Sequence, residues 1–185
     1  MTDFHNILQT QEQEMLEGIN TCAICRIETV DLSTMKADVV PLFDEELTPI
    51  LNVPIAAHQT SDFIIRVPYK VGDLVLVVFS QRDIDPIMFG GGEASVRMHG
   101  IDDALIVGGI NLFNDPLPNE HSEDIVISKK DMTTKIVLTK DDEIIFKSKK
   151  ITIDAPDGVE IKGGDITMTG GAITANGEDL TVDLV

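Results

Sequence analysis

The last third of the chain repeats apolar residues in pairs whose two members are separated by one residue. Successive pairs begin 11, 8, 7, 8, 7, 7 and 7 residues apart, and glycines or charged residues lie between them. A spacing of two is the alternation of a β-strand, and frequent Gly and Thr disfavour the helices of a coiled coil. The pattern therefore predicts eight short strands joined by tight turns. The pairs are Ile125/Ile127, Ile136/Leu138, Ile144/Phe146, Ile151/Ile153, Val159/Ile161, Ile166/Met168, Ile173/Ala175 and Leu180/Val182.

One chain cannot enclose a core with units of seven or eight residues, because single-chain β-solenoids use roughly 20 or more residues per coil. Three chains wound together would turn each apolar pair toward a common axis and would cover the strand edges. We therefore predict an intertwined trimeric β-helix over residues 124–185. With about 4.8 Å per strand layer, this needle would be on the order of 40 Å long. Its predicted trimer core consists of Ile136, Leu138, Ile144, Phe146, Ile151, Ile153, Val159, Ile161, Ile166, Met168, Ile173, Leu180 and Val182.

The part of the chain from about residue 21 to residue 113 carries a different pattern, in which short strands alternate with turn residues. Residues 22–30 and 35–43 predict a hairpin across a turn at 31–34. The apolar run 74–79 predicts a strand that is buried on both faces. Five or six such strands in roughly 95 residues predict a small closed or half-closed barrel.

The two ends of this barrel segment are marked by other patterns. Residues 4–19 place apolar residues at helical spacing among Glu and Gln, which predicts a short N-terminal helix ending near Gly18. The polar, proline-containing stretch NDPLPNE begins at Asn114 and predicts a connector. The chain is thus expected to be all-β apart from the helix. Its predicted parts are the helix 1–20, the barrel domain 21–113, a linker 114–123 and the needle 124–185.

The charge balance narrows the range of partners. The formal net charge is -18, with 14 basic and 32 acidic residues, and aromatic residues make up only 4% of the chain. An acidic surface repels phosphate backbones, and few aromatic side chains are present to stack on bases or sugars. No apolar run is long enough for a transmembrane helix, and the N-terminus lacks the pattern of a secretory signal. We therefore expect synthesis in a cytoplasm and no nucleic-acid partner.

Motifs that could carry chemistry have simpler structural interpretations. Cys22 and Cys25 are separated by three positions in a predicted strand, which places their side chains on opposite faces, and no second Cys pair completes a zinc site. Gly90-Gly91-Gly92 lacks the Lys and Ser or Thr of a phosphate-binding loop, so a flexible loop is expected. A lone histidine such as His99 is more often a structural group than a ligand.

Clustered carboxylates raise the alternative of glycoside hydrolysis, which uses a pair of acids. No Trp lines a sugar cleft, and the chain has no room for a separate lysozyme domain. We expect solvated turns at these clusters, and a turn where Asp83 and Asp85 lie beside Arg82. The sequence predicts no enzyme, no catalytic, cofactor-binding or metal-ligating residue, and no cofactor. The clusters are Asp44-Glu45-Glu46, Asp102-Asp103 and Asp141-Asp142-Glu143.

Three stretches of the barrel region resemble a known family. They are CAICRIETVDLSTMKADVVPL at residues 22–42, VPYKVGDLVLVVFSQRDID at 67–85 and RMHGIDDALIVGGIN at 97–111. Followed by a needle, they resemble baseplate assembly protein V, the central spike or membrane-puncturing protein of contractile phage tails. The resemblance implies an OB-fold barrel that docks on the tail hub, a homotrimer, and a needle that pierces the host cell envelope. It also implies a place in the baseplate of a virion.

The chain departs from this family at its tip. Many such spikes bind iron through a His-x-His motif near the apex, whereas His5, His58, His99 and His121 all precede the repeat and none forms that motif. Either the tip closes without metal or a separate protein caps it, and the resemblance leaves open an ion on the trimer axis or at the apex. The alternatives to a spike are an OB-fold nucleic-acid-binding protein and a polysaccharide-active tail protein.

Overall fold

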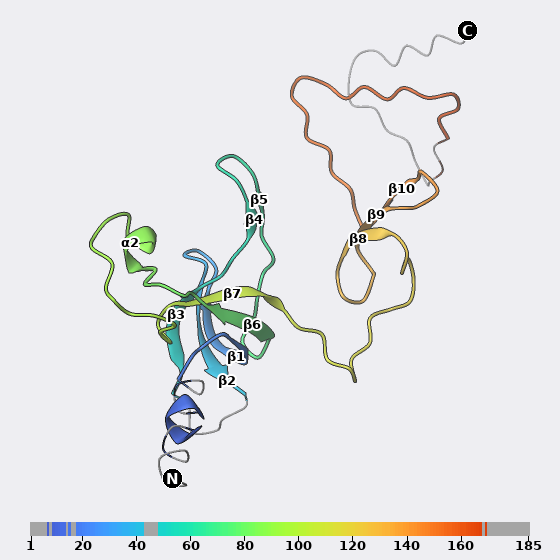
Figure 1. Ribbon diagram of the computed structural model, residues 1–185. Coiled ribbons are helices and arrows are strands. Elements are labelled where there is room, and N and C mark those ends of the chain that lie inside the picture. The colour runs from blue at the N-terminus through green and yellow to red at the C-terminus, as the bar shows by residue number, and fades with distance from the viewer. Residues whose placement is uncertain are drawn as a thin grey trace. The chain divides into compact units, whose positions relative to one another are not determined.

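The computed structural model describes residues 7, 9–13, 15, 18–42, 48–167 and 169. The chain divides into two compact units, Met1–Leu117 and Pro118–Val185, and the division falls within the stretch 114–123. Figure 1 shows that the described structure is mostly β, as the sequence predicts. In the part of the chain that the structure describes, no helix has the length and apolar character needed to span a membrane.

The first unit is built on one five-stranded sheet that curls into a half-barrel (Figure 1). Its strand order is β3-β2-β1-β6-β7, and each neighbouring pair is antiparallel. Residues 7, 9–13 and 15 precede it with helical backbone, in agreement with the predicted N-terminal helix. The strands are β1 (Cys22–Asp31), β2 (Lys36–Pro41), β3 (Ile50–Pro54), β6 (Leu74–Phe79) and β7 (Ala104–Gly109).

Alternation of apolar residues along these strands supplies the core. In β1, Ala23, Cys25 and Ile27 are buried while the residues between them are exposed. In β6, Val75 and Val77 are fully buried, but the intervening side chains are only half-buried. The prediction that this strand is buried on both faces is therefore wrong for its outer face. A sheet that curls on itself has one inner face, so only every second residue reaches the core.

The sheet curls until its two outermost strands meet. Ile55, just after β3, forms an isolated parallel bridge with Ile106 of β7, and the Ala56 N–H donates to the Ile106 carbonyl at 2.8 Å. Register shifts occur in the pairs β1–β2, β2–β3 and β6–β7. Such irregularities bend and twist strands, which allows a short sheet to close.

The turns predicted in this unit are present. The Asp31 carboxylate accepts hydrogen bonds from the Ser33 N–H at 2.8 Å and the Thr34 hydroxyl at 2.9 Å, which fixes the β1–β2 turn. Gly72, with φ +91°, lies in the turn before β6. The segment FIIRVPY forms only the two-residue strand β5 (Ile64–Ile65), paired with β4 (His58–Gln59). The short helix α2 (Asp85–Met88) was not predicted.

The second unit contains a three-stranded antiparallel sheet of order β10-β9-β8. Its strands, β8 (Ile125–Ser128), β9 (Lys135–Leu138) and β10 (Ile144–Lys147), coincide with the first three predicted apolar pairs. The intertwined β-helix would send successive strands of one chain to different faces of a prism. Here the three consecutive strands pair with one another within the chain, because loops of six and five residues let it reverse.

Residues 148–167 continue without regular strands, among the residues that the structure describes. A turn occurs where the sequence predicts one, with the Gly158 N–H donating to the Ala155 carbonyl at 2.9 Å. The predicted strands around Ile151, Val159 and Ile166 therefore lack β-partners within this part of the chain.

Candidate assembly surface

One face of the β8–β10 sheet consists of large apolar side chains. The strand register places the first three apolar pairs directly opposite one another. The side chains form two rows across the strands, Ile125–Leu138–Ile144 and Ile127–Ile136–Phe146. These six residues are 38–67% exposed. Scattered exposed apolar residues are ordinary, but a contiguous apolar patch marks an interaction surface.

The opposite face of the same sheet is closed by the unit's own residues. Val137 is fully buried there, and Met132 from the β8–β9 loop is buried as well. The Lys135 side chain is only 3% exposed and forms an ion pair with Glu120. The hydrogen bond from Lys135 lowers the pKa of the Glu120 carboxyl below its ordinary value. The six large exposed apolar side chains therefore all lie on one face of the sheet.

Local hydrogen bonds shape both loops of this sheet. In the β8–β9 loop the Lys129 N–H donates to the Thr134 carbonyl at 3.0 Å, and the Met132 N–H donates to the Lys129 carbonyl at 2.9 Å. In the β9–β10 loop the Thr139 N–H donates to the Glu143 carbonyl at 2.9 Å, and the Glu143 N–H donates to the Thr139 hydroxyl at 3.0 Å. Because these contacts are local, the sheet is specified by a short segment of one chain.

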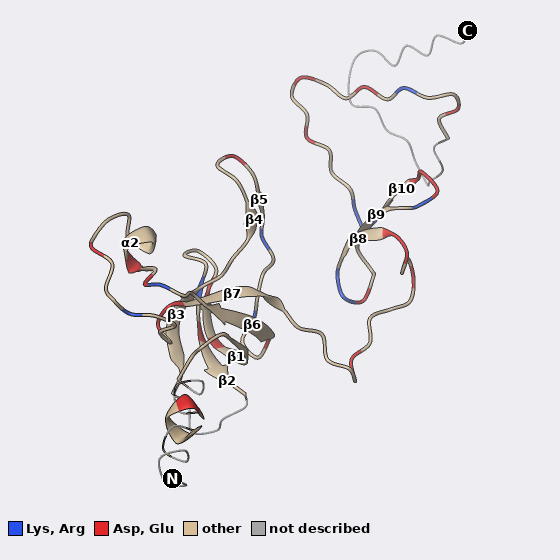
Figure 2. Cartoon of the chain, in the orientation of Figure 1, with Lys and Arg blue, Asp and Glu red and all other residues tan. Residues whose placement is uncertain are grey.

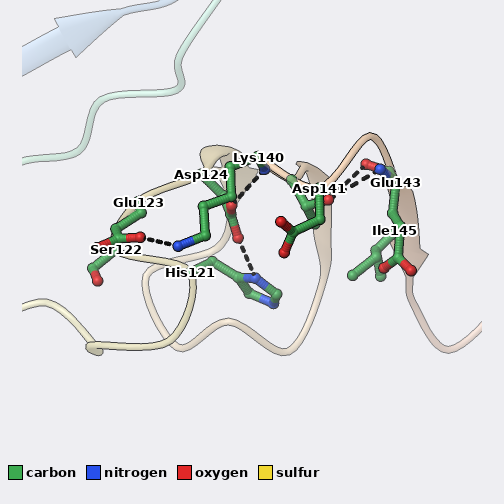
Figure 3. A pocket seen from close by; sticks show the side chains of 9 residues that line it. His121, Ser122, Glu123, Asp124, Lys140, Asp141, Glu143 and Ile145 are labelled. Atoms are coloured by element: carbon green, nitrogen blue, oxygen red, sulfur yellow. Dashed lines mark hydrogen bonds and ion pairs between the residues drawn. The ribbon is translucent and has the colours of Figure 1, made fainter.

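An open, polar pocket of about 400 Å³ lies beside the β9–β10 turn (Figure 3). His121 Nδ1 lies 2.8 Å from an Asp124 carboxylate oxygen, and the other oxygen accepts from the Lys140 N–H at 3.0 Å. Lys140 also pairs with Glu123. The hydrogen bond from the Lys140 N–H lowers the pKa of the Asp124 carboxyl, and the contact with His121 lowers it further. These contacts hold residues 121–124 against the β9–β10 turn. The polar residues that line the pocket therefore have a structural role.

The predicted trimer core divides into three groups. The structure brings Ile136, Leu138, Ile144 and Phe146 together, and it adds Ile125 and Ile127, which the predicted core omitted. A second group is 55–68% exposed on backbone without strand partners in the described chain: Ile151, Ile153, Val159, Ile161 and Ile166. The remaining residues, Met168, Ile173, Leu180 and Val182, lie outside the described residues.

In the first unit, the structure reveals a charged clamp that sequence reasoning missed. The Arg97 guanidinium donates two hydrogen bonds of 2.7 Å to Asp103 and one of 3.0 Å to Asp83. Asp103 also accepts from the Ile84 N–H at 3.0 Å, and Asp83 accepts from the Ser95 N–H at 2.8 Å. The clamp thus fixes both ends of the loop that carries α2.

The clamp buries two acids of this loop, one of which the sequence predicts to be solvated. Asp103 is fully buried rather than part of a solvated turn, because Arg97 neutralises its charge. Asp83, which the sequence predicts in a turn beside Arg82, is also buried, and it pairs with Arg97. The acidic residues at 141–143 are exposed in a turn, as predicted, and the cluster at 44–46 lies outside the described residues.

The other motifs have the structural roles that the sequence suggests. Cys22 is exposed and Cys25 is buried, in agreement with opposite faces of a strand, and burial raises the pKa of the Cys25 thiol to about 11. His99 Nδ1 lies 3.1 Å from the Asn20 carbonyl oxygen. The side-chain amide of Asn20 in turn donates to the His99 carbonyl at 2.8 Å. Gly90, with φ +73°, ends α2 in a loop. Among the residues that the structure describes, no group of three or more potential ligands is arranged to hold a metal.

Comparison with known proteins finds a similarity between the first unit and a phage protein domain. Residues 23–109 match the family model of the phage protein Gp138 N-terminal domain. No curated protein matches the chain. The match begins in β1 and ends in β7, so it spans the five strands of the barrel sheet and the Arg97 clamp. It supports a phage protein, and it does not single out the baseplate assembly protein V family.

Proposed function

We propose that this chain is the central spike of a contractile, phage-tail-like baseplate, where it acts as a homotrimer whose needle pierces the host cell envelope. The observation that carries the proposal is the exposed apolar face of β8–β10, on a chain whose barrel matches a phage protein domain. The proposed partners are two further copies, the tail hub and, at the tip, a capping protein. The proposed location is the virion baseplate.

The arrangement of the barrel strands supports an OB-type base for this spike. An OB-fold is a five-stranded, partly open Greek-key barrel. In the first unit β1, β2 and β3 form a meander, β6 pairs with the free edge of β1, and β7 meets the end of β3 through Ile55 and Ile106. This order supports the proposal of an OB-type base, which the resemblance to baseplate assembly protein V implies.

The energetics of the apolar face favour self-association. Fully removing one large aliphatic or aromatic side chain from water stabilises by roughly 1.5–3 kcal/mol. Six such side chains already lie side by side, so association would bury them without first ordering a new surface. Preorganisation of this kind lowers the entropic cost of binding. The alternation of apolar residues continues from Ile151 to Ile166. There a partner chain would also supply the backbone hydrogen bonds of neighbouring strands.

The alternative functions have less support. A nucleic-acid-binding barrel requires a basic groove with stacking aromatics, whereas the net charge is -18 and acidic residues are spread along both units (Figure 2). A polysaccharide-active protein requires a pair of suitably placed acids. The buried acids Asp83 and Asp103 are both held by Arg97. We therefore propose a non-enzymatic, structural role.

Sedimentation and electron microscopy of the purified full-length protein test this function. A spike should sediment at three times the chain mass and should form a particle with a wide base and a narrow rod. Antibodies against residues 148–167 should label the rod, and antibodies against the barrel should label its base. A folded monomer would contradict the proposal, as would a trimer without a rod.

A further inference from the structure

The repeat contains two segments that differ in how their strands find partners. Residues 125–147 form a sheet whose hydrogen bonds lie entirely within one chain. Residues 148–167 carry the same alternation of apolar residues, but no strand pairing occurs among the residues described there. The first segment is thus paired into a sheet within one chain, and the apolar face of that sheet is uncovered. The second segment requires other chains for its backbone as well.

We propose that residues 118–147 form a trimerisation collar, in which each chain supplies one complete three-stranded face. In this collar the three apolar faces meet on the axis, and its assembly sets the register of the repeat that follows. This inference rests on the proposed function as a trimeric spike. It differs from the fully intertwined needle because successive strands of one chain stay on the same face.

The partner that fits this surface is another copy of the same chain. The apolar pairs continue without interruption from Ile125 to Ile166, on both sides of the point where intrachain pairing ends. A different protein would need a matching repeat of its own to cover them. The opposite face of the sheet is already closed by Val137, Met132 and the Lys135–Glu120 pair, so each copy offers one face to the axis.

The three chains must also be held in one register along the distal repeat, by which we mean the apolar pairs from Ile151 onward. Its pairs that begin at Ile151, Val159, Ile166 and Ile173 are 8, 7 and 7 residues apart. A slip of one chain by one seven-residue unit would still place apolar residues against apolar residues, and register is weakly specified in such a repeat. The collar has no equivalent slip, because its apolar pairs begin 11 and 8 residues apart and its strands are joined by specific loops.

The collar should also form earlier than the distal repeat. Its strands are joined by loops of six and five residues, so its contacts are local in sequence and close quickly. The link from His121 through Asp124 to the Lys140 backbone adds a further local constraint. Pairing between chains must instead overcome the entropy of association, which is reduced once three collars hold the chains together.

Disulfide topology tests which strands belong to one chain. Val126 and Val137 are cross-strand neighbours. Val137 lies on the face turned away from the proposed axis, and alternation along β8 places Val126 on that face too. Cysteines at facing strand positions have Cα separations that permit a disulfide.

We would combine Val126→Cys with Val137→Cys in a Cys22→Ser background, and leave the buried Cys25 in place. The collar predicts a trimer by native mass whose chains run singly on a non-reducing denaturing gel and have lost two hydrogens by intact mass.

The other outcomes overturn the inference in distinguishable ways. Covalent dimers and trimers on the gel would show that β8 and β9 pair between chains, while the proposed spike would stand. A folded trimer in which no disulfide forms would contradict the β8–β9 register. A folded monomer with the disulfide closed would contradict the proposed function together with the collar.

Assembly order is tested by two substitutions in the full chain. Ile136→Asp on the collar face should give a monomer, with residues 148–167 open to protease. Ile153→Asp should leave the trimer intact through the collar but make the distal repeat at least tenfold more sensitive to protease. Thr152→Asp is the matched control and should behave as the unmodified protein. Loss of the trimer in Ile153→Asp, with retention in Ile136→Asp, would reverse the proposed order and overturn it.

Discussion

Arg97 and Asp103 are joined by two hydrogen bonds of 2.7 Å, from the guanidinium Nε to one carboxylate oxygen and from a terminal nitrogen to the other. Asp103 is fully buried, whereas a third of the Arg97 side chain is exposed. These paired hydrogen bonds stabilise the carboxylate as a buried anion. They also hold together the two ends of the loop between β6 and β7. The hydrogen bonds that Arg97 donates lower the pKa of the Asp103 carboxyl.

Gly100 should be required for this clamp. A Cβ at this position would lie 2.7 Å from the Arg97 Cδ and 2.7 Å from an Asp103 carboxylate oxygen. We expect Gly100→Ala to destabilise the protein by about 1–3 kcal/mol, the usual cost of overpacking. Gly108→Ala is the control, since its Cβ would meet nothing within 4 Å. Urea unfolding measures both, and equal midpoints for the two variants would contradict the clamp.

The β1–β2 turn should contribute to the loss of stability in acid. Hydrogen bonds from the Ser33 side chain and backbone lower the pKa of Asp31 from 3.8 to about 2. Because the folded pKa lies below the unfolded value, the contribution is present above about pH 4 and is lost as the pH falls toward 2. We expect Asp31→Asn to have a shallower dependence of the unfolding midpoint on pH in this window. An unchanged slope would show that these hydrogen bonds do not persist in solution.

Lys135 and Glu120 should respond unequally to substitution. The Lys135 side chain is buried, while Glu120 is half-exposed. Removing the anion leaves a buried cation without its partner, whereas replacing the cation by an apolar chain of similar volume leaves a carboxylate that water can solvate. We therefore expect Glu120→Gln to lower the thermal midpoint by several degrees and Lys135→Met to leave it nearly unchanged. The opposite order would show that Lys135 is hydrated in solution.

The sequence predicted local structure better than it predicted pairing. Alternation identified β1, the apolar run at residues 74–79 identified β6, and the spacing of Ile136 and Leu138 placed β9 correctly, because these signals depend on a few neighbouring residues. The same alternation does not say which strand lies alongside, so the antiparallel meander of β8–β10 was not foreseen. The Arg97 clamp was missed for a related reason: Asp83 lies 14 residues from Arg97, and in sequence it resembles any other acid in a turn.

The distal repeat itself allows the last prediction. Val159 and Ile166 begin successive units that are seven residues apart. Deleting residues 159–165 moves Ile166 into the position of Val159 and preserves the alternation relative to Ile151. Deleting only residues 159–164 moves Ile166 one position further along the chain, and a shift by one residue turns every following side chain to the opposite face of its strand.

If the repeat packs around a trimer axis, the seven-residue deletion should retain the trimer and its resistance to heat, with a rod shorter by about one strand layer of 4.8 Å. The six-residue deletion should lose protease resistance beyond residue 158 while the collar still holds three chains together. The two proteins differ by a single residue in length, so a difference between them reports the phase of the repeat rather than its extent. Equal protease sensitivity in both would show that the alternation beyond residue 158 does not define a packed face.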